Sequence, residues 1–202
     1  MGKFPLALVT LVAIGVSPWL APAMAQEQAQ YLRFAVMALS DNKASRVEFE
    51  NQLVNRMAEN RYDAVASYAL IPDLDTLQSM PVRTRMLDAG VQAILILRPL
   101  EVPEGDILTP QQLQISPDEF SSVSRFISAY RGDSFEVRTV VQIAGFLLDR
   151  DASRLFWHGV IWLDDSVETE QNRIDKIVDL VQFNLDNSRN ALRLQLGLPT
   201  LP

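Results

Sequence analysis

The stretch Ala89-Gly90-Val91-Gln92-Ala93-Ile94-Leu95-Ile96-Leu97 decides the fold class of this chain. Its second part, 91–97, is apolar on both faces of an extended backbone. A strand needs such a continuous apolar run when helices cover both sides of it, as at the centre of a parallel sheet. Gly90 is a good C-terminal stop for a preceding helix. The stretch therefore predicts a helix that ends at Gly90 and a buried central strand after it.

Two further strands are expected upstream of the central one, at 32–39 and at 62–70, and Pro72 stops the second of these. The segment 45–48, Ser-Arg-Val-Glu, fits a capping box at the start of a helix. That helix is expected to run to about Asn60, because apolar residues recur behind the box at helical spacing: Val47, Phe49, Leu53, Val54 and Met57.

The helix before Gly90 is expected to begin near Pro81, since proline suits the first turn of a helix. The preceding segment, 73–80, is interpreted as a loop or a short helix. The first half of the chain thus has the order strand, helix, strand, helix, strand. Crossovers between parallel strands in this order should be right-handed.

The second half predicts a long loop over 98–117, which is rich in proline, and then a helix over 118–130. One face of that helix is apolar: Phe120, Val123, Phe126, Ile127 and Tyr130. Arg131-Gly132-Asp133 is interpreted as a turn. The segment 135–148 alternates with a period of two and predicts a long strand, in which Gly145 marks a bulge.

The segment 149–153 is interpreted as a turn, and 154–163 as the returning strand of a hairpin. A long helix is expected from Val167 to a stop at Gly197. The predicted fold class is therefore α/β with a mixed sheet. A β-α-β-α-β half is followed by an antiparallel hairpin and a long C-terminal helix, and helices flank the sheet on both faces.

The N-terminus predicts export. Lys3 is the only charge before Glu27, and the run 6–16 is apolar with no polar residue except Thr10. Ala23-Met24-Ala25 ends the segment and puts small residues at the −3 and −1 sites. This pattern is typical of a secretory signal peptide, here over residues 1–25. Cleavage is expected after Ala25, with Ala23 as the alternative. A polar leader, 26–30, and a single domain, 31–202, would follow in the periplasm or outside the cell.

The composition excludes several classes of site. The chain has no cysteine, which rules out disulfides, thiolate metal sites and a lipid-modified N-terminal cysteine. Loss of Lys3 with the signal peptide would leave 17 basic and 25 acidic residues, a net charge of −8. We expect no nucleic acid partner, because that affinity comes from neutralised phosphates. No later apolar run has membrane length, so no stable membrane insertion is expected after cleavage.

His158, the only histidine, is the obvious catalytic candidate. As a strand residue it shares a face with Asp164, but six residues along a strand span about 20 Å. That aspartate therefore cannot orient the imidazole, and Ser153 points to the other face. No G-x-S-x-G elbow supplies a nucleophile. We expect no catalytic residue here and interpret His158 as a partly buried or edge histidine.

No metal or cofactor site is expected either. Asp149, Asp151 and Ser153 resemble the start of a calcium loop, but the glycine and the distal glutamate of that motif are missing. A tight turn explains these residues. The acidic residues around the start of the last helix suit the positive end of its dipole: Asp164, Asp165, Glu168 and Glu170.

The hairpin carries a second apolar face, which is expected to include Val140, Ala144 and Leu148. Its most prominent members are the residues of a possible partner or ligand face: Phe146, Phe156, His158, Val160 and Trp162. Two interpretations remain open. The helix at 118–130 covers this face, which we favour, or the face binds a partner.

Four stretches resemble a family of small, exported, largely uncharacterised bacterial envelope proteins. They are Arg46-x-x-Phe49-Glu50-x-x-Leu53-Val54, Ala64-Val65-Ala66-Ser67-Tyr68 with Pro72, Ala89-Gly90-x-x-Ala93-Ile94-Leu95, and Leu148-Asp149 followed by Leu155-Phe156-Trp157. The resemblance implies a fold like the N-terminal domain of TolB and the lipoprotein activators of penicillin-binding proteins. It also implies binding and scaffolding. This chain has Gln92 where such proteins usually have aspartate, and it lacks the lipoprotein cysteine.

The leading hypothesis is a soluble periplasmic, non-catalytic binding or accessory module of a cell-envelope complex, with an envelope protein as partner. One alternative is a small apolar-ligand or lipid carrier that uses the hairpin face. The other is a hydrolase that uses His158 with distant carboxylates. The sequence leaves the oligomeric state open.

Overall fold

The computed structural model describes residues 32–78, 81–101, 118–130, 139–162 and 170–195, and the structural statements below concern these residues. The expected signal peptide, polar leader and turn at 131–133 lie outside them. So do most of the expected proline-rich loop and the acidic residues Asp164, Asp165 and Glu168. None of the described helices combines the length and the hydropathy that a membrane span needs.

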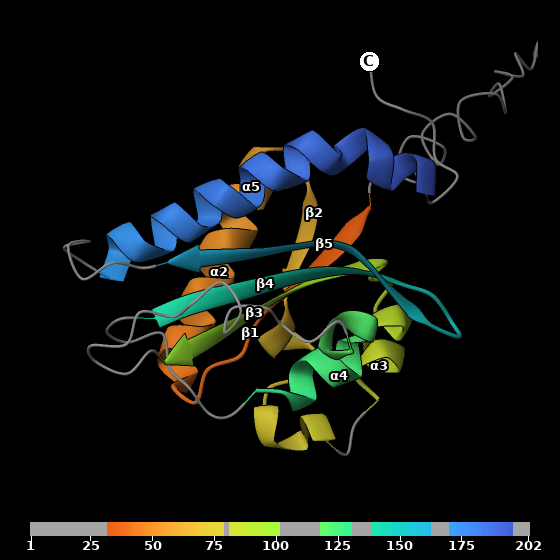
Figure 1. The fold of residues 1–202 in the computed structure, drawn as a ribbon, viewed down its shortest axis with the longest axis horizontal. Coiled ribbons are helices and arrows are strands. Elements are labelled where there is room, and N and C mark those ends of the chain that lie inside the picture. The colour runs from red at the N-terminus through yellow and green to blue at the C-terminus, as the bar shows by residue number, and fades with distance from the viewer. Residues whose placement is uncertain (1–31, 79–80, 102–117, 131–138, 163–169, 196–202) are drawn as a thin grey trace, which may run out of the picture. The chain divides into compact units, whose positions relative to one another are not determined.

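Five strands form one mixed sheet, in the spatial order β2-β1-β3-β4-β5 (Figure 1). They are β1 (Arg33–Ala38), β2 (Asp63–Ala66), β3 (Ala93–Glu101), β4 (Thr139–Leu148) and β5 (Ser153–Trp162). Strand β1 pairs in parallel with β2 and β3, while β3–β4 and β4–β5 are antiparallel pairs. The α/β fold class and the mixed sheet predicted from the sequence are confirmed.

Helices cover both faces of the sheet. The helices are α2 (Lys43–Glu59), α3 (Val82–Asp88), α4 (Val123–Ser128) and α5 (Glu170–Gln195), with short 3-10 turns η1 (Ser67–Ala69), η2 (Leu74–Gln78) and η3 (Glu119–Ser121). Helices α2 and α5 pack on one face, and α3 and α4 pack on the other (Figure 1). We call these the α2/α5 face and the α3/α4 face.

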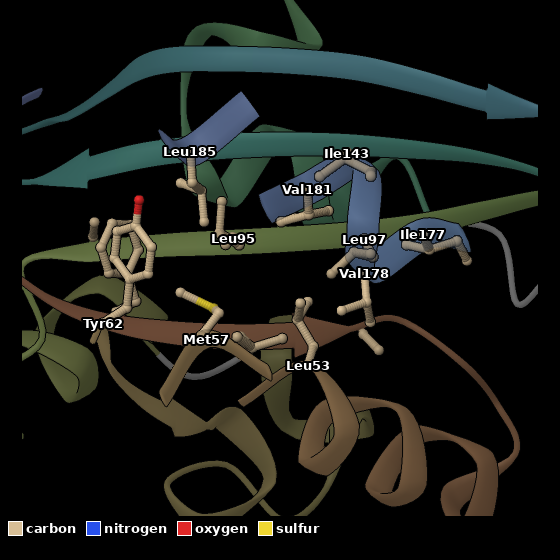
Figure 2. Close-up of a cluster of buried hydrophobic side chains, with 14 of the residues drawn as sticks. Leu53, Met57, Tyr62, Leu95, Leu97, Ile143, Ile177, Val178, Val181 and Leu185 are labelled. Atoms are coloured by element: carbon tan, nitrogen blue, oxygen red, sulfur yellow. The ribbon is translucent and has the colours of Figure 1, made fainter. Parts of the chain in front are cut away.

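The central strand β3 supplies side chains to both cores, as its continuous apolar run predicts. Leu95 and Leu97 belong to the core of the α2/α5 face, and Ile94 and Ile96 to that of the α3/α4 face; all four are 0% exposed. Figure 2 shows the first of these cores, where side chains of α2 and α5 converge around Leu95 and Leu97 of β3: Leu53, Met57, Ile177, Val178, Val181 and Leu185.

Strand β3 is longer than predicted, because it continues through Pro99 to Glu101 instead of ending in a loop at Arg98. Leu39 N donates to Leu97 O at 2.8 Å, so the backbone of Leu97 faces β1. Pro99, two residues on, faces the same side, where β1 has already ended at Ala38. The missing N–H of the proline therefore costs no ladder hydrogen bond, as on an edge strand.

Two helix starts differ from the sequence prediction. Helix α2 is capped by Asn42, whose Oδ1 accepts from the backbone N–H groups of Ala44 and Ser45, so the capping box expected at Ser45 is wrong. Asn42 precedes Ser45 by three residues, so the helix begins about one turn earlier than the capping box predicts. The helix expected over 118–130 is interrupted at Ser122, whose extended backbone separates η3 from α4 and whose hydroxyl caps α4.

The second strand is also shorter than the predicted 62–70, because a buried polar cluster draws the chain out of the sheet after Ala66. Glu50 Oε1 accepts from Arg46 Nε at 2.9 Å and from Ser67 Oγ at 2.8 Å, and Glu50 Oε2 accepts from Tyr68 N at 2.9 Å. Arg46 and Glu50 are 2% and 0% exposed. The backbone from Ser67 to Ala69 therefore turns toward α2 as η1.

Replacement of Glu50 by glutamine should destabilise the protein by about 3–5 kcal/mol, because it leaves the buried Arg46 guanidinium without its counter-charge. Urea unfolding followed by circular dichroism measures this as a lower midpoint at an unchanged slope. Glu48→Gln on the exposed side of α2 is the matched control and should stay within about 0.5 kcal/mol of the parent. Equal midpoints for the two variants would contradict the central role of Glu50.

Candidate functional site

The hairpin contains one bulge, at the glycine that the sequence analysis marked. Strands β4 and β5 pair residue for residue from Val140↔Trp162 to Gly145↔Trp157, and the next pair is Phe146↔Leu155. Phe156 is therefore the extra residue, and the prediction of a bulge at Gly145 is confirmed. An extra residue changes the alternation, so side chains before and after it exchange faces relative to a regular strand.

The bulge places two consecutive aromatic residues on the same face of β5. Phe156 and Trp157 both pack, partly buried, against the core of the α2/α5 face, while Leu155 packs against the core of the α3/α4 face. In a regular strand Phe156 and Trp157 would point to opposite faces. Trp157 keeps the face that alternation predicts, and Phe156 does not.

Each of these two aromatic rings lies over a glycine. A Cβ atom on Gly145 would overlap the ring of Phe156, and a Cβ atom on Gly159 would lie 2.9 Å from Cζ2 of Trp157. Real Cβ atoms essentially never approach other atoms so closely. Glycine in a strand often marks a position where another group approaches the backbone. Here the two glycines let the rings lie against the sheet surface.

Arg154 completes this surface. It pairs with Leu147, which belongs to the core of the α2/α5 face, and directly paired residues share a face. The Arg154 side chain is exposed, and those of Phe156 and Trp157 are half-buried. We call Arg154, Phe156 and Trp157 the β5 aromatic patch. It lies on the half of β5 that is nearest to the hairpin turn.

The partner or ligand face expected from the sequence is therefore divided. Phe146 is 0% exposed beneath α4, and its ring lies 6.0 Å from that of Phe126. Phe156 lies on the opposite face because of the bulge. Val160 is half-buried on the α3/α4 side, and the side chain of Trp162 lies outside the described part of the structure.

Coverage of the α3/α4 face by the segment 118–130, the interpretation that the sequence favoured, is confirmed for its buried part. Side chains of η3 and α4 share one core with those of β4: Phe120, Val123, Phe126 and Ile127 with Ala144, Phe146 and Leu148. The sequence analysis missed the β5 aromatic patch as a unit. The signal that could have located it was the presence of two glycines, Gly145 and Gly159, in hairpin strands that also carry Phe156 and Trp157.

His158 lies on the last strand of the sheet and is exposed. Its ring stacks on Phe120 with 5.0 Å between centroids. Among the described residues no hydrogen bond reaches the imidazole. The Ser153 hydroxyl accepts from Val123 N at 3.0 Å and so fixes the start of α4. In the described part of the chain the contact made by the imidazole is this stacking on Phe120.

Asp149 shapes the backbone of the hairpin turn. Asp149 N donates to Ala152 O at 2.9 Å, and the Asp149 carboxylate accepts from Arg150 N at 2.7 Å. In the described part of the chain no three acidic or histidine side chains are placed to hold one metal ion.

Gly145→Ala should destabilise the protein by about 1–3 kcal/mol, because the new methyl group displaces the Phe156 ring from its seat. In a Phe156→Leu background the same change should cost less than about 0.5 kcal/mol, since the overlapping ring is gone. Urea unfolding of the two single variants and the double variant measures this coupling. Additive costs would show that the ring does not depend on the glycine.

No protein-family model and no curated protein matches this chain. A solved structure with a partly similar arrangement is the lipoprotein GNA1162 from Neisseria meningitidis, with 11% sequence identity and a TM-score of 0.40. The similarity covers 78% of this chain and 98% of that chain. The resemblance to the N-terminal domain of TolB and to activators of penicillin-binding proteins gains no support from these comparisons and stays a prediction.

Proposed function

We propose that this protein is an exported, non-catalytic accessory module of the cell envelope that binds another protein through the β5 aromatic patch. The observation that carries the proposal is the placement of Arg154, Phe156 and Trp157 together on one face of the terminal strand. Tryptophan and arginine are enriched among the residues that dominate protein–protein binding energies. Export rests on the N-terminal pattern of the sequence.

The local construction of the patch supports a binding role. Its two aromatic rings are fixed by packing against the core and by the glycines beneath them, so little side-chain entropy remains to be lost on binding. Arg154 adds a cation with a planar, multiply donating head group beside them. Such a rigid, half-exposed aromatic surface beside an arginine is suited to receive an apolar side chain with a neighbouring carboxylate.

Trp157→Ala should weaken partner binding by about 30-fold, the loss expected when a dominant interface residue of 2 kcal/mol is removed. A photo-crosslinking amino acid at position 152, an exposed residue of the turn next to the β5 aromatic patch, in intact producing cells, followed by mass spectrometry, identifies the partner. Affinity is then measured with the purified pair by calorimetry.

Phe183→Ala is the matched control for that experiment. Phe183 on α5 is 63% exposed, the most exposed large hydrophobic side chain among the described residues. Its removal should leave affinity unchanged if binding occurs at the β5 aromatic patch. Equal losses for Trp157→Ala and Phe183→Ala, or crosslinks that do not respond to Trp157→Ala, would reject this patch as the binding surface.

The hydrolase alternative is tested with His158→Ala. In a binding module this change removes only the stacking contact with Phe120, at a cost of about 0.5–1.5 kcal/mol in stability. A hydrolase that uses this imidazole would lose about 100-fold or more in turnover of its substrate. Turnover of a panel of ester, amide and glycoside substrates by the parent, abolished by this change, would replace our proposal.

The lipid-carrier alternative predicts a response from the tryptophans on β5. Trp157 and Trp162 are the only tryptophans that would remain after cleavage behind Ala25. A carrier that seats an apolar chain beside them would shift their emission on addition of phospholipid vesicles. A spectrum that does not change would leave the protein-binding proposal in place.

A further inference from the structure

We propose that the partner contributes an extended segment that pairs, antiparallel, with the outer edge of β5 as a sixth strand, with a carboxylate opposite Arg154. This inference rests on the proposed function, which requires only that the partner contacts the β5 aromatic patch. It adds a main-chain mode of recognition and the chemistry of the segment that is recognised.

Strand β5 is the last strand of the sheet, and no described strand pairs with its outer edge. The edge spans ten residues. Edge strands are commonly blunted by proline, by charged side chains or by a bulge. From Ser153 to Trp162 there is no proline, and Arg154 is the one residue with a permanent charge. The bulge at Phe156 is therefore its main irregularity.

The hydrogen bonds of the sheet show which backbone groups of β5 point outward. Leu97 O accepts from Leu39 N at 2.8 Å, so the backbone of Leu97 faces β1. Its partner on β4, Ile143, must then face β5, and Gly159, which pairs with Ile143, faces β4. Because backbone groups alternate along an antiparallel strand, those of His158 and Val160 face outward.

A second hydrogen bond gives the same result on the other side of the bulge. Leu148 N donates to Gln92 O at 2.8 Å, so the backbone of Leu148 faces β3 and away from β5. Its partner Ser153 therefore faces outward, and so does Leu155 two residues on. Leu155, His158 and Val160 thus present donors and acceptors to which an added strand can bond.

The charge of the edge favours a foreign segment over a second copy of this chain. Arg154 is exposed, and β5 contains no carboxylate that could oppose it if two copies of β5 paired. Two copies would also bring together two chains that each carry a formal charge of −7. A partner strand with one glutamate or aspartate opposite Arg154 supplies the cross-strand charge pair that a second copy lacks.

The side chains of an added strand would continue both faces of the sheet. On the α2/α5 side its alternate residues would lie beside Arg154 and Trp157, so apolar residues that flank the carboxylate fit the β5 aromatic patch. The recognised segment is therefore extended, alternates in polarity and carries one acidic residue among apolar ones.

The test uses the full chain and a synthetic peptide as long as β5, in which valine and threonine alternate and one glutamate is placed to oppose Arg154. Hydrogen exchange of the backbone amides is followed by NMR on the parent protein. On addition of the peptide, exchange at Leu155, His158 and Val160 should slow by about tenfold or more, since these amides become hydrogen-bonded. The same peptide with alternate amides N-methylated should give no protection.

Two variants of one residue separate the backbone from the side chain. Val160→Pro removes an outward N–H without breaking the β4–β5 ladder and should weaken peptide binding by about tenfold or more. Val160→Ala keeps that N–H and should change affinity by less than about threefold. Urea unfolding checks that both variants keep the fold, and the exchange data on the parent need no variant.

Absence of peptide binding, or binding without protection of the three amides, would overturn the strand-addition inference. Protection of these amides in the absence of peptide, with a dimer in sedimentation, would assign the edge to a second copy and overturn it as well. If cellular crosslinks at position 152 still require Trp157 but persist in Val160→Pro, the proposed function stands and this inference fails. If the crosslinks do not require Trp157, the proposed function fails first.

Discussion

The buried carboxylate of Glu50 is the constraint on which the first half of the structure depends. Its Oε1 accepts from Ala38 N at 3.0 Å as well as from Arg46 and Ser67, and its Oε2 accepts from Tyr68 N. One side chain of α2 thus fixes the end of β1 and the end of β2. A buried charge costs several kcal/mol unless it is paired and hydrogen-bonded, so no arrangement that separates these segments retains the same stability.

A second arginine has the corresponding role on the other face. Arg98, 2% exposed, donates to Gln142 Oε1 at 2.9 Å, to Phe126 O at 3.1 Å and to Glu119 Oε2 at 2.7 Å, and its guanidinium lies 4.5 Å from the centre of the Phe126 ring. These contacts hold η3 and α4 over β4. The α3/α4 face is thereby closed over Phe146, and the half-exposed aromatic surface of the hairpin is left on the opposite face.

Strands and turns that depend on a local residue pattern could be predicted from the sequence. Element ends that depend on a polar side chain distant in sequence could not. The central strand and the bulge at Gly145 could be recognised from hydropathy and from one glycine. The end of β2 could not, because it depends on Glu50, which is far from it in sequence. The capping box at Ser45 was plausible, yet the helix starts one turn earlier, where Asn42 accepts from the backbone N–H groups of Ala44 and Ser45. The start of the expected loop at Arg98 was wrong, because β3 continues to Glu101 and proline has no cost where a neighbouring strand has ended.

The bulge at Phe156 changes the candidate site, because it determines on which face of the sheet the Phe156 side chain lies. Strict alternation assigns Phe156 to the side of His158, and a bulge predicted at Gly145 does not say which strand carries the extra residue. Only the pairing of Gly145 with Trp157 and of Phe146 with Leu155 settles this. The expected partner face therefore lost Phe146 to the core and Phe156 to the other side of the sheet.

Strand β5 departs from the usual preferences of a strand in three ways within a short distance. It contains Gly159, it faces Gly145 on β4, and it carries two successive aromatic residues on one side. Each glycine costs about 0.5–1 kcal/mol relative to a residue with a side chain, and a bulge interrupts the ladder. A strand that only closed a sheet could carry β-branched residues at these positions and be more stable. Departures of this kind concentrate at functional sites, because they are retained where they position a surface rather than where they stabilise a core. Here the two glycines and the bulge position the rings of Phe156 and Trp157 on one side of β5. These rings lie beside Arg154, which is exposed, on a strand whose outer edge pairs with no described strand.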